Sequence, residues 1–491
     1  MPARPRPFRL LPPVDVLVLG AGLAGLRAAL AAKESRPDAS VTLASLRHEP
    51  SGSSFANRNR MLGMQVLERP DQAERFVRRA IELASPGRID PALVACMAAE
   101  SGQVFQYLRG CGLSFREDGA LRVPACFFPE QASAALLTDL PRACDLLTRR
   151  LDTAGAQRMH GLVCLDLLAE RCETPTRVCG ALLAPVAGGP ALAIPARTVI
   201  LATGGPAALF ERDISGAGST GCSYALLERA GATLDNAGFL QWMWYVVGGE
   251  FFPIQELVRP GARLLTGLGD VLNLPCELTR FGPERGGHCP FGYGLPDAAL
   301  DCFLAGLAGP DGTVRVALPE NATAPSEWTA IAPAAHAGNG GARIDLDGRT
   351  TCPGLFACGE CATGMHGANR IGGAMILATQ VFGARAGRAA ATQAAEERYS
   401  PPRDPQPFRP ALLPSPGLHD PAHESWLARL MQTVAVFGGR PGLAEAPPRL
   451  RATLHACTAP LSALRLESGL VVLRSLSPVE PVADSGTESE R

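Results

Sequence analysis

The sequence predicts an α/β protein: a Rossmann-like dinucleotide-binding domain with an inserted α+β domain and C-terminal helices. Two observations predict the Rossmann-like domain. One is a glycine-rich turn between a strand and a helix near the N-terminus, and the other is a buried strand that ends in Ala-Thr-Gly-Gly near residue 200. A change of composition after residue 238 predicts the insertion. The chain has 491 residues, too long for one hydrophobic core, so two or three domains are expected.

The glycine-rich turn lies in Val14–Leu30, where the apolar run Val14–Leu19 breaks and then resumes at helical spacing. Gly20 permits a tight turn, Gly22 lets backbone N–H groups approach a pyrophosphate at the positive end of the helix dipole, and Gly25 lets helix and strand pack closely. Glycine turns occur in many βα units, so the motif alone is a weak signal. The strand before it and the helix after it make a dinucleotide site the better interpretation.

The second predicted strand covers residues 39–46, and the loop over 51–65 follows it. An acidic residue often ends this strand and binds ribose hydroxyls, but Ser45 or a neighbour holds that place here. The loop is rich in small polar residues and glycine, so its backbone donors are free to face a cofactor. On composition alone, a plain surface loop is an equally good interpretation.

Apolar residues at helical spacing predict helices over 71–108 and 136–151. Short apolar runs separated by turns predict strands and hairpins over 160–200. The last of these strands ends in small residues, where we expect the backbone to pass close to the cofactor: Ala202, Thr203 and Gly204.

Composition also predicts the domain boundaries. Residues 239–334 carry three of the four tryptophans and many glycines and prolines, so they are predicted to form the insertion. The dinucleotide-binding domain then has two parts, 1–238 and 335–399. Seven prolines predict a linker over 400–419. The remaining predictions are a helical region with two helices over 420–475 and a disordered tail over 476–491.

Charge and cysteine content exclude several classes of protein. The formal net charge is −1 and no Lys/Arg block dominates, so nucleic acid binding has no electrostatic footprint. No apolar run reaches the length of a membrane span. The 15 cysteines are odd in number and scattered, and the arginines near the N-terminus are followed by the glycine turn and not by a cleavage-like site. Reduced thiols and a cytoplasmic location are therefore expected.

The segment Ala334–Gly373 reads AAHAGNGGARIDLDGRTTCPGLFACGECATGMHGANRIGG. It is similar to the flavoprotein subunits of fumarate reductase and succinate dehydrogenase, which have H-Y-x-M-G-G-I, D-G-R-T, P-G-L-Y-A-x-G-E and H-G-A-N-R-L in this order. Within that family the chain resembles the L-aspartate oxidases most. The resemblance covers roughly residues 12–395, and more weakly the helices to about 473. It implies a two-dinucleotide-binding-domain flavoprotein in which the insertion is a capping domain.

The resemblance implies FAD as the cofactor. Gly20, Gly22 and Gly25 would hold its pyrophosphate, and the family also has a serine near the end of the second strand, so Ser45 is no objection. Glu360 would bind the ribitol hydroxyls, because a carboxylate can accept two hydrogen bonds from a diol. Serines of the loop over 51–65 would lie along the pyrophosphate: Ser51, Ser53 and Ser54. That loop has no histidine for a covalent link, and His48 lies several places too early, so non-covalent FAD is expected.

The chemistry that the resemblance implies is hydride transfer between a carbon of a small (di)carboxylate and flavin N5. Such a reaction needs cationic groups that hold carboxylates in a fixed pose and a proton donor or acceptor opposite the flavin. Arg370 matches the substrate-clamping arginine of the family, and His336 matches its carboxylate-binding histidine. For both residues the alternative is a structural role, as a packed histidine or an exposed arginine.

The predicted capping domain departs from the family pattern. Where the family has F-x-Q-F-H-P-T, this chain keeps Gln241 but has Met243 in place of the substrate-binding histidine. Where the family has its acid/base arginine, the alignment places Asp301. Arg280 and Arg285 could substitute for that arginine. These departures put a dicarboxylate substrate in doubt, but they do not affect the expectation of FAD.

Three further expectations concern metals, partners and activity. Cys358 and Cys361 form a CxxC, but both flank Glu360 in a segment whose geometry the cofactor dictates, so no metal site is expected. The sequence has no cysteine spacing of its own for an iron–sulfur cluster, so a flavoprotein subunit of that kind would need an iron–sulfur or other electron-transfer partner. A third possibility is a degenerate homologue that retains FAD without dehydrogenation.

Overall fold

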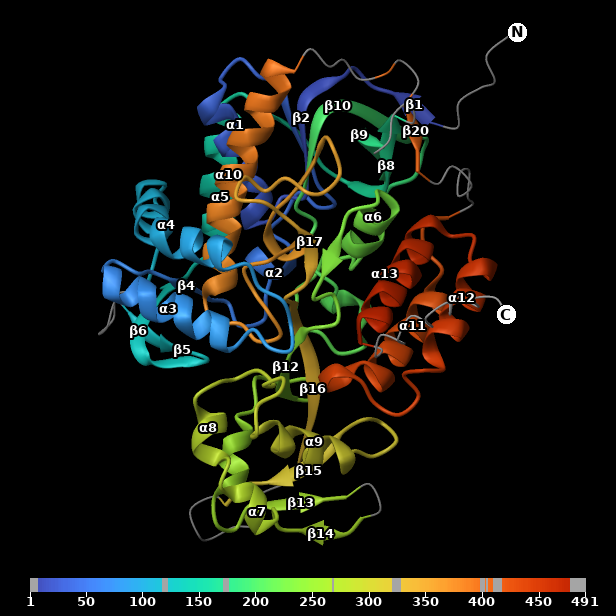
Figure 1. Ribbon diagram of the computed structural model, residues 1–491. Coiled ribbons are helices and arrows are strands. Elements are labelled where there is room, and N and C mark those ends of the chain that lie inside the picture. Colours follow the sequence, from blue (N-terminus) through green and yellow to red (C-terminus); the bar gives the residue numbers. More distant parts are fainter. Residues whose placement is uncertain are drawn as a thin grey trace, which may run out of the picture.

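The structure is a computed structural model that describes residues 8–116, 122–170, 176–266, 269–319, 328–397, 402, 405–408 and 417–476. Most of the predicted linker over 400–419 lies outside these residues, and so does the predicted tail beyond Leu476. In Figure 1 the described elements form an upper body around a large sheet, a lower body, and a group of helices beside them.

A sheet of nine described strands forms the centre of the upper body, in the order β20-β8-β9-β10-β2-β3-β7, and β1 and β18 also pair with β10. The strands are β1 (Phe8–Leu10), β2 (Val14–Leu19), β3 (Val41–Ala44), β7 (Gln157–Met159), β8 (Leu162–Glu170), β9 (Arg177–Pro185), β10 (Ala191–Leu201), β18 (Leu355–Ala357) and β20 (Gln406–Pro407). Strands β18, β10, β2, β3 and β7 pair in parallel, while β8 and β9 are antiparallel to their neighbours. The parallel part is the half of the sheet that a Rossmann-like domain requires.

Strand β10 joins the two halves of this sheet. Its first residues pair with β9, and residues 196–201 pair with β2. Backbone hydrogen bonds of 2.8 Å from Ala202 to Leu19 and from Gly20 to Ala44 close the carboxyl ends of these strands. Because parallel strands end at one edge, the segments after β2, β3 and β10 meet there.

Helices α1 (Leu23–Ser35) and α10 (Ala374–Glu396) lie side by side against the sheet (Figure 1). Glycines let the two backbones approach: a Cβ added at Gly387 would lie 2.1 Å from the Ala28 carbonyl oxygen. Further elements cover the same body, namely α3 (Pro70–Glu82), α4 (Pro91–Gly110), α5 (Leu140–Thr153), β4 (Leu62–Gln65), β5 (Val123–Ala125) and β6 (Phe128–Leu137). The last three strands form a small antiparallel sheet.

The lower body, which we call the cap, runs from β12 (Leu240–Val246) to β16 (Thr329–Gly338). Its sheet has the order β12-β16-β15-β13-β14. The other cap elements are β13 (Arg263–Leu265), β14 (Val271–Leu272), β15 (Val314–Ala317), α7 (Cys276–Thr279), α8 (Gly282–Gly286) and α9 (Ala298–Gly306). Trp244, Leu300 and Ile331 are buried in a core of the cap's own.

The C-terminal helices α11 (Pro421–Val434), α12 (Ala446–Ala456) and α13 (Pro460–Leu476) pack together beside the sheet. Helix α13 contacts α6 (Ser223–Arg229) through a buried ion pair of 2.6 Å between Arg229 and Glu467. Its Arg465 also donates to the Thr220 carbonyl at 2.8 Å. The end of the described chain thus braces the loop that precedes α6.

Two expected helices differ from the structure. The helix predicted over 136–151 begins only at Leu140, because residues to Leu137 continue β6 and the Asp139 side chain caps the helix by accepting from the Arg142 N–H at 3.3 Å. The second C-terminal helix is two helices, α12 and α13, which break before Pro460. A proline disfavours helical backbone in the residue before it, so the break follows from the sequence.

In the part of the chain that the structure describes, no helix combines the length and the hydropathy needed to cross a bilayer.

Candidate functional site

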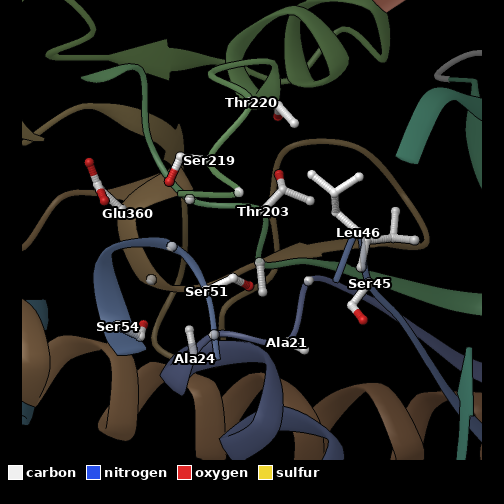
Figure 2. Close-up of a pocket in the computed structure, with 18 of the residues that line it drawn as sticks. Ala21, Ala24, Ser45, Leu46, Ser51, Ser54, Thr203, Ser219, Thr220 and Glu360 are labelled. Carbon is white, nitrogen blue, oxygen red and sulfur yellow. The ribbon is translucent and has the colours of Figure 1, made fainter. Parts of the chain in front are cut away.

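An elongated cavity lies at the carboxyl ends of β2, β3 and β10 and encloses about 1180 Å³ of empty space, part of it continuous with solvent. In Figure 2, Ser45 and Leu46 lie at one end and Glu360 at the other, with Ser51, Ser54 and Thr203 between them. All but one of the residues predicted to bind the cofactor line it: Gly20, Gly22, Ser45, Ser51, Ser53, Ser54, Ala202, Thr203, Gly204 and Glu360. Gly25 does not line the cavity but shapes its wall.

The glycine turn is set by close backbone contacts. Gly20 has φ +108°, a conformation that other residues rarely adopt, and a Cβ there would lie 2.3 Å from the Ala202 carbonyl oxygen. A Cβ at Gly25 would lie 1.9 Å from the Gly20 carbonyl oxygen. The turn, the helix and β10 can therefore pack this closely only without side chains at these two positions.

Gly22 has a different role. Its φ of −73° suits any residue, and the nearest atom to an added Cβ is Ser54 Oγ at 3.1 Å. That hydroxyl accepts from the Leu23 N–H, also at 3.1 Å, at the N-terminus of α1. Gly22 therefore keeps free the space in front of a helix N-terminus, where backbone N–H groups favour an anion.

Hydroxyl groups supply most of the remaining polar lining. Thr203 Oγ1 is buried and has no hydrogen-bond partner among the described residues, as expected of a group that a ligand satisfies. Ser219 and Thr220 also line the cavity, although sequence reasoning did not name them as site residues (Figure 2). Their signal was the run GAGSTG before α6, whose glycines and hydroxyls are typical of a loop beside a phosphate.

Ser45 lies at the cavity with its hydroxyl already engaged. Its Oγ donates to the Arg47 carbonyl at 2.9 Å and lies 2.9 Å from His160 Nδ1. His160 in turn packs edge-on against His48 at 4.8 Å between ring centroids. His48 is thus paired with His160 near the Ser45 end of the cavity.

Glu360 lies at the opposite end, on a short turn after β18. Its Oε1 accepts from the Gly338 N–H at 2.8 Å, and a Cβ at Gly205 would overlap its carboxyl group. Burial raises the pKa of Glu360 to about 7, against the opposing effects of the Gly338 N–H and the Arg370 charge. A carboxylate has further acceptor sites, so Glu360 can also accept from a ligand hydroxyl.

A second group of polar side chains surrounds Arg370, beyond the Glu360 end of the cavity. The buried guanidinium donates to Asn339 Oδ1 at 3.3 Å and to Gln241 Oε1, and Gln241 Nε2 donates back to the Arg370 carbonyl at 3.5 Å. Among the described residues no carboxylate is within ion-pair distance of it. Burial lowers the pKa of Arg370 to about 10, so the group remains a cation at neutral pH.

Two histidines lie close enough to Arg370 for its charge to affect them. His336 Nδ1 and His366 Nε2 are buried and have no hydrogen-bond partner within the described chain. Burial, and secondarily the Arg370 charge, lowers the pKa of His336 to about 4, and the same causes lower the pKa of His366. Both rings are therefore neutral at pH 7, and each has an unused nitrogen.

A β-bulge sets the direction of His336. Gln241 pairs with Ala337 and Trp242 with Ala335, so His336 has no partner on β12. A bulge redirects a side chain out of the regular alternation of a strand, and bulges are frequent next to active sites. The structure thus brings together three of the four predicted catalytic residues: Arg370, His336 and Gln241.

The fourth, Asp301, lies elsewhere. It is fully buried on α9, accepts from Trp244 Nε1 at 2.9 Å, and forms a bidentate ion pair with Arg285 at 3.0 and 3.2 Å. Both carboxylate oxygens accept hydrogen bonds within the cap. These contacts disfavour the expected role of Asp301 in proton transfer. Alignment by spacing across a glycine-rich stretch assigned it that role, whereas the fold makes it the partner of Arg285.

The other cap residues that could have substituted are also engaged. The buried Arg285 donates to the His288 and Cys289 carbonyls as well as to Asp301. Arg280 is exposed and lies over the Phe281 ring at 4.7 Å. Met243 packs in an apolar cluster with Ile214, Tyr245 and Ala334.

Cys358 and Cys361 are buried, and their sulfurs face backbone carbonyls. Cys361 Sγ lies 3.1 Å from the Leu201 oxygen and Cys358 Sγ 3.9 Å from the Ala24 oxygen. Burial raises the pKa of both thiols, so they remain protonated and pack as small apolar groups.

Comparison with known proteins gives one family and one group of relatives. The chain matches the family described as "FAD binding domain" over residues 15–275 and 300–376. It is 29% identical to an L-aspartate oxidase of Halobacterium salinarum, over 80% of this chain and 78% of that one. An L-aspartate oxidase of Caulobacter vibrioides is also 29% identical, with 87% and 84% of the two chains covered.

Solved structures share the fold. A structure titled "Quinol-Fumarate Reductase with Menaquinol Molecules" has a TM-score of 0.72 at 19% identity, covering 95% of this chain and 90% of that chain. The Mycobacterium smegmatis Sdh1 complex in its apo form has a TM-score of 0.71 at 20% identity, covering 95% and 86%. Because the sequence identities are 20% or lower, these matches establish only that the fold is shared.

Proposed function

The chain belongs to the FAD binding domain family, and from this premise we propose that it is an FAD-dependent oxidoreductase that transfers hydride between flavin N5 and a carbon of a small carboxylate. A single observation supports a carboxylate as the substrate. The buried Arg370 guanidinium donates to two amide oxygens and, among the described residues, to no carboxylate.

The residues of the cavity fit FAD. Gly22 leaves open the space in front of the α1 N-terminus, where a pyrophosphate would sit. Thr203 Oγ1 is buried without a partner in the described chain and needs one. Glu360 offers a carboxylate oxygen at the far end for sugar-alcohol hydroxyls. Bound FAD would supply a carrier for two electrons and a hydride at N5.

The argument for a carboxylate substrate is electrostatic. A buried cation is costly unless it is paired, and amide oxygens compensate a charge only in part. Asn339 and Gln241 fix the orientation of the Arg370 guanidinium without neutralising it. A substrate carboxylate would complete the pairing with charge-assisted hydrogen bonds, and the planar fork would fix its direction relative to the cofactor.

The two neutral histidines extend this anion site. Each imidazole has one N–H donor, and the buried nitrogens of His336 and His366 have no partner in the described residues. We assign them to hydrogen bonds with the substrate carboxylate or with the atom that changes oxidation state. Because their pKa values are lowered, they bind without adding a second buried positive charge.

The apolar cluster around Met243 limits the rest of the substrate. Met243, which stands where the related pattern has a polar histidine, packs in a cluster with Ala334 and the ring of Tyr245. A second carboxylate there would be desolvated without a partner. The substrate that fits best is therefore a small acid with one anionic end and an uncharged remainder, and the cap closes that remainder off from water.

The test is a set of anaerobic flavin-reduction assays on the purified yellow protein, with succinate, L-aspartate and small monocarboxylates that carry an oxidisable carbon, and the reverse assay with fumarate. We expect bleaching by at least one monocarboxylate and very weak or absent turnover of succinate and fumarate. Robust fumarate reduction would contradict the substrate class. Acid or heat should release the flavin; flavin that stays with the denatured chain would contradict non-covalent binding.

The departures in the cap support a second candidate, a homologue that retains FAD but performs no dehydrogenation. Asp301 and Arg285, either of which could have served as the proton donor, pair with each other. If no substrate bleaches the flavin, this candidate is favoured. An electron-transfer subunit, iron–sulfur or other, as the acceptor is part of the first candidate, and co-purification tests it.

A further inference from the structure

Two cysteines meet where the cap contacts the upper body. Cys126 lies in the turn between β5 and β6, and Cys289 lies in the cap after α8. Their sulfurs are 2.9 Å apart, and the Cys289 N–H donates to Cys126 Sγ at 3.3 Å. Both residues are partly exposed.

The backbone around the two thiols is already held together. The Phe127 N–H donates to the Gly287 carbonyl at 3.1 Å, and the Phe127 ring stacks on His288 at 4.2 Å between centroids. Phe127 has φ +64°, which is uncommon for a residue other than glycine and marks a conformation that its surroundings enforce. Cross-linking the neighbouring sulfurs would therefore need side-chain rotation more than movement of the two bodies.

This contact is close to the substrate side of the site. The Gly372 N–H, two residues after Arg370, donates to the Cys126 carbonyl at 2.9 Å. Cys126 is also near enough to Arg370 for the two charges to interact. On the cap side, Cys289 packs against the apolar group that includes Met243 and Tyr245.

The two thiols have unequal proton affinities. The hydrogen bond between the two thiols lowers the pKa of Cys126 to about 6, and the Cys289 backbone N–H and the charges of His288 and Arg285 act in the same direction. The hydrogen bond with Cys126 and burial raise the pKa of Cys289, so this thiol keeps its proton. A thiolate beside a protonated thiol is the arrangement of an attacking and a resolving cysteine.

We propose that Cys126 and Cys289 are a redox-active pair whose disulfide fastens the cap to the β5–β6 turn beside Arg370. With a low-molecular-weight disulfide such as oxidised glutathione, the Cys126 thiolate attacks one sulfur and releases the first glutathione thiolate. Cys289 then loses its proton and attacks Cys126 Sγ, which releases the second. Two protein thiols are oxidised by two electrons, and one external disulfide is reduced to two thiols.

The disulfide would fix the cap to the β5–β6 turn at this contact. In the reduced protein, hydrogen bonds and ring stacking hold the cap at this point, and such contacts open and close on fast timescales. A covalent link between residues 163 positions apart removes that freedom. The oxidised protein is therefore the form in which the cap is held more rigidly.

The experiment incubates the FAD-loaded full-length protein with oxidised glutathione and maps cysteine-containing peptides without reduction. We expect a Cys126–Cys289 linked peptide that disappears with dithiothreitol, and a melting temperature about 2 °C or more higher in the linked form. Cys289→Ser should instead accumulate a glutathione adduct on Cys126, because the resolving thiol is absent. Cys126→Ser should give neither product. These readouts do not depend on any substrate, so they fail or succeed independently of the proposed function.

Cys302→Ser is the matched control, since Cys302 is an exposed cap cysteine. It should leave the linked peptide unchanged. The proposal is overturned if wild-type protein yields no Cys126–Cys289 peptide while Cys302 becomes glutathionylated, or if the linked form melts at the same temperature as the reduced form.

Discussion

The cofactor cavity and the substrate side under the cap differ in the groups that supply their polar atoms. The polar lining of the cavity comes from the backbone and from small hydroxyl side chains, beside aliphatic residues such as Leu46 and Leu162, and glycine contacts such as that of Gly20 with Ala202 hold the backbone. Long side chains from distant elements form the substrate side, as where Arg370 meets Gln241 and Asn339. The first region depends on where the main chain goes, whereas the second depends on which side chains the fold brings together. Substrate chemistry can therefore change in the second region without loss of the cofactor.

Gly22→Val tests the cofactor cavity, and of the predicted effects this one should be the largest. The new side chain fits the backbone, whose φ is −73°, but fills the space beside Ser54 where the pyrophosphate would lie. We expect a folded protein whose flavin content, measured by absorbance, falls to about a tenth of wild type or less. Gly102→Ala, at a helix position with no atom within 4 Å of the added Cβ, should keep its flavin. Wild-type flavin in folded Gly22→Val would refute the assignment.

Asp301→Asn tests whether the cap residue that the alignment pointed to is structural. The substitution removes the carboxylate that pairs with the buried Arg285. This should lower the free energy of unfolding by on the order of 3–5 kcal/mol. Denaturant unfolding measures it, with the exposed cap variant Asp270→Asn as control. Unchanged stability combined with lost turnover would return Asp301 to the catalytic residues.

Arg370→Lys tests whether the Arg370 guanidinium binds the substrate carboxylate. Lysine keeps the charge but cannot reproduce the planar fork that Gln241 and Asn339 orient. We expect a loss on the order of 2–4 kcal/mol, or about 30- to 1000-fold in kcat/KM, with unchanged flavin content. Where no turnover is found, flavin difference spectra on titration with carboxylates give the affinity. Arg385→Lys, in a surface ion pair with Glu100, should change either readout about threefold at most. Loss of flavin or stability before loss of binding would indicate a structural role.

The smallest effect expected is the pH dependence that Glu360 adds to the cofactor-free protein. Burial raises its folded-state pKa to about 7 from an ordinary 4.5, so the folded state binds the proton more tightly than the unfolded chain. Glu360 therefore contributes its full share to the free energy of unfolding below about pH 4.5. This contribution is lost as the pH rises to about 7, and the loss is no more than about 3 kcal/mol. Relative to wild type, Glu360→Gln should therefore gain stability between pH 5 and 8, measured by urea unfolding. Parallel curves for both proteins, as expected for the exposed control Glu130→Gln, would contradict the shift.

Local sequence was sufficient for the cofactor side. The spacing of Gly20, Gly22 and Gly25 encodes one turn, and the residues that contact it are fixed once a strand precedes and a helix follows. The Ser54 hydroxyl and the small residues after β10 follow from the same parallel topology. These features are short-range, so a motif determines them and the structure adds distances.

The substrate side could be predicted only in part. Arg370 and His336 lie in a segment with a family-like pattern, but the bulge that redirects His336 arises from pairing with β12, some hundred residues earlier. For Asp301, spacing alone cannot show that Arg285 and Trp244 occupy both of its oxygens, so its catalytic role stays a prediction that these contacts disfavour. The Cys126–Cys289 contact joins residues 163 apart and has no local signal at all.

The brace that α13 provides to the cavity has a consequence for biosynthesis. Arg465 donates to the carbonyls of Thr220 and Ala208, so the last described helix positions a loop that lines the cofactor cavity. A ribosome must therefore translate the chain through this helix before the cavity has its final wall. Flavin uptake is then a late event, after the chain has left the exit tunnel. Ribosome-bound chains stalled before Pro460 should carry no flavin, whereas chains stalled after an added C-terminal extension that brings Leu476 out of the tunnel should carry it.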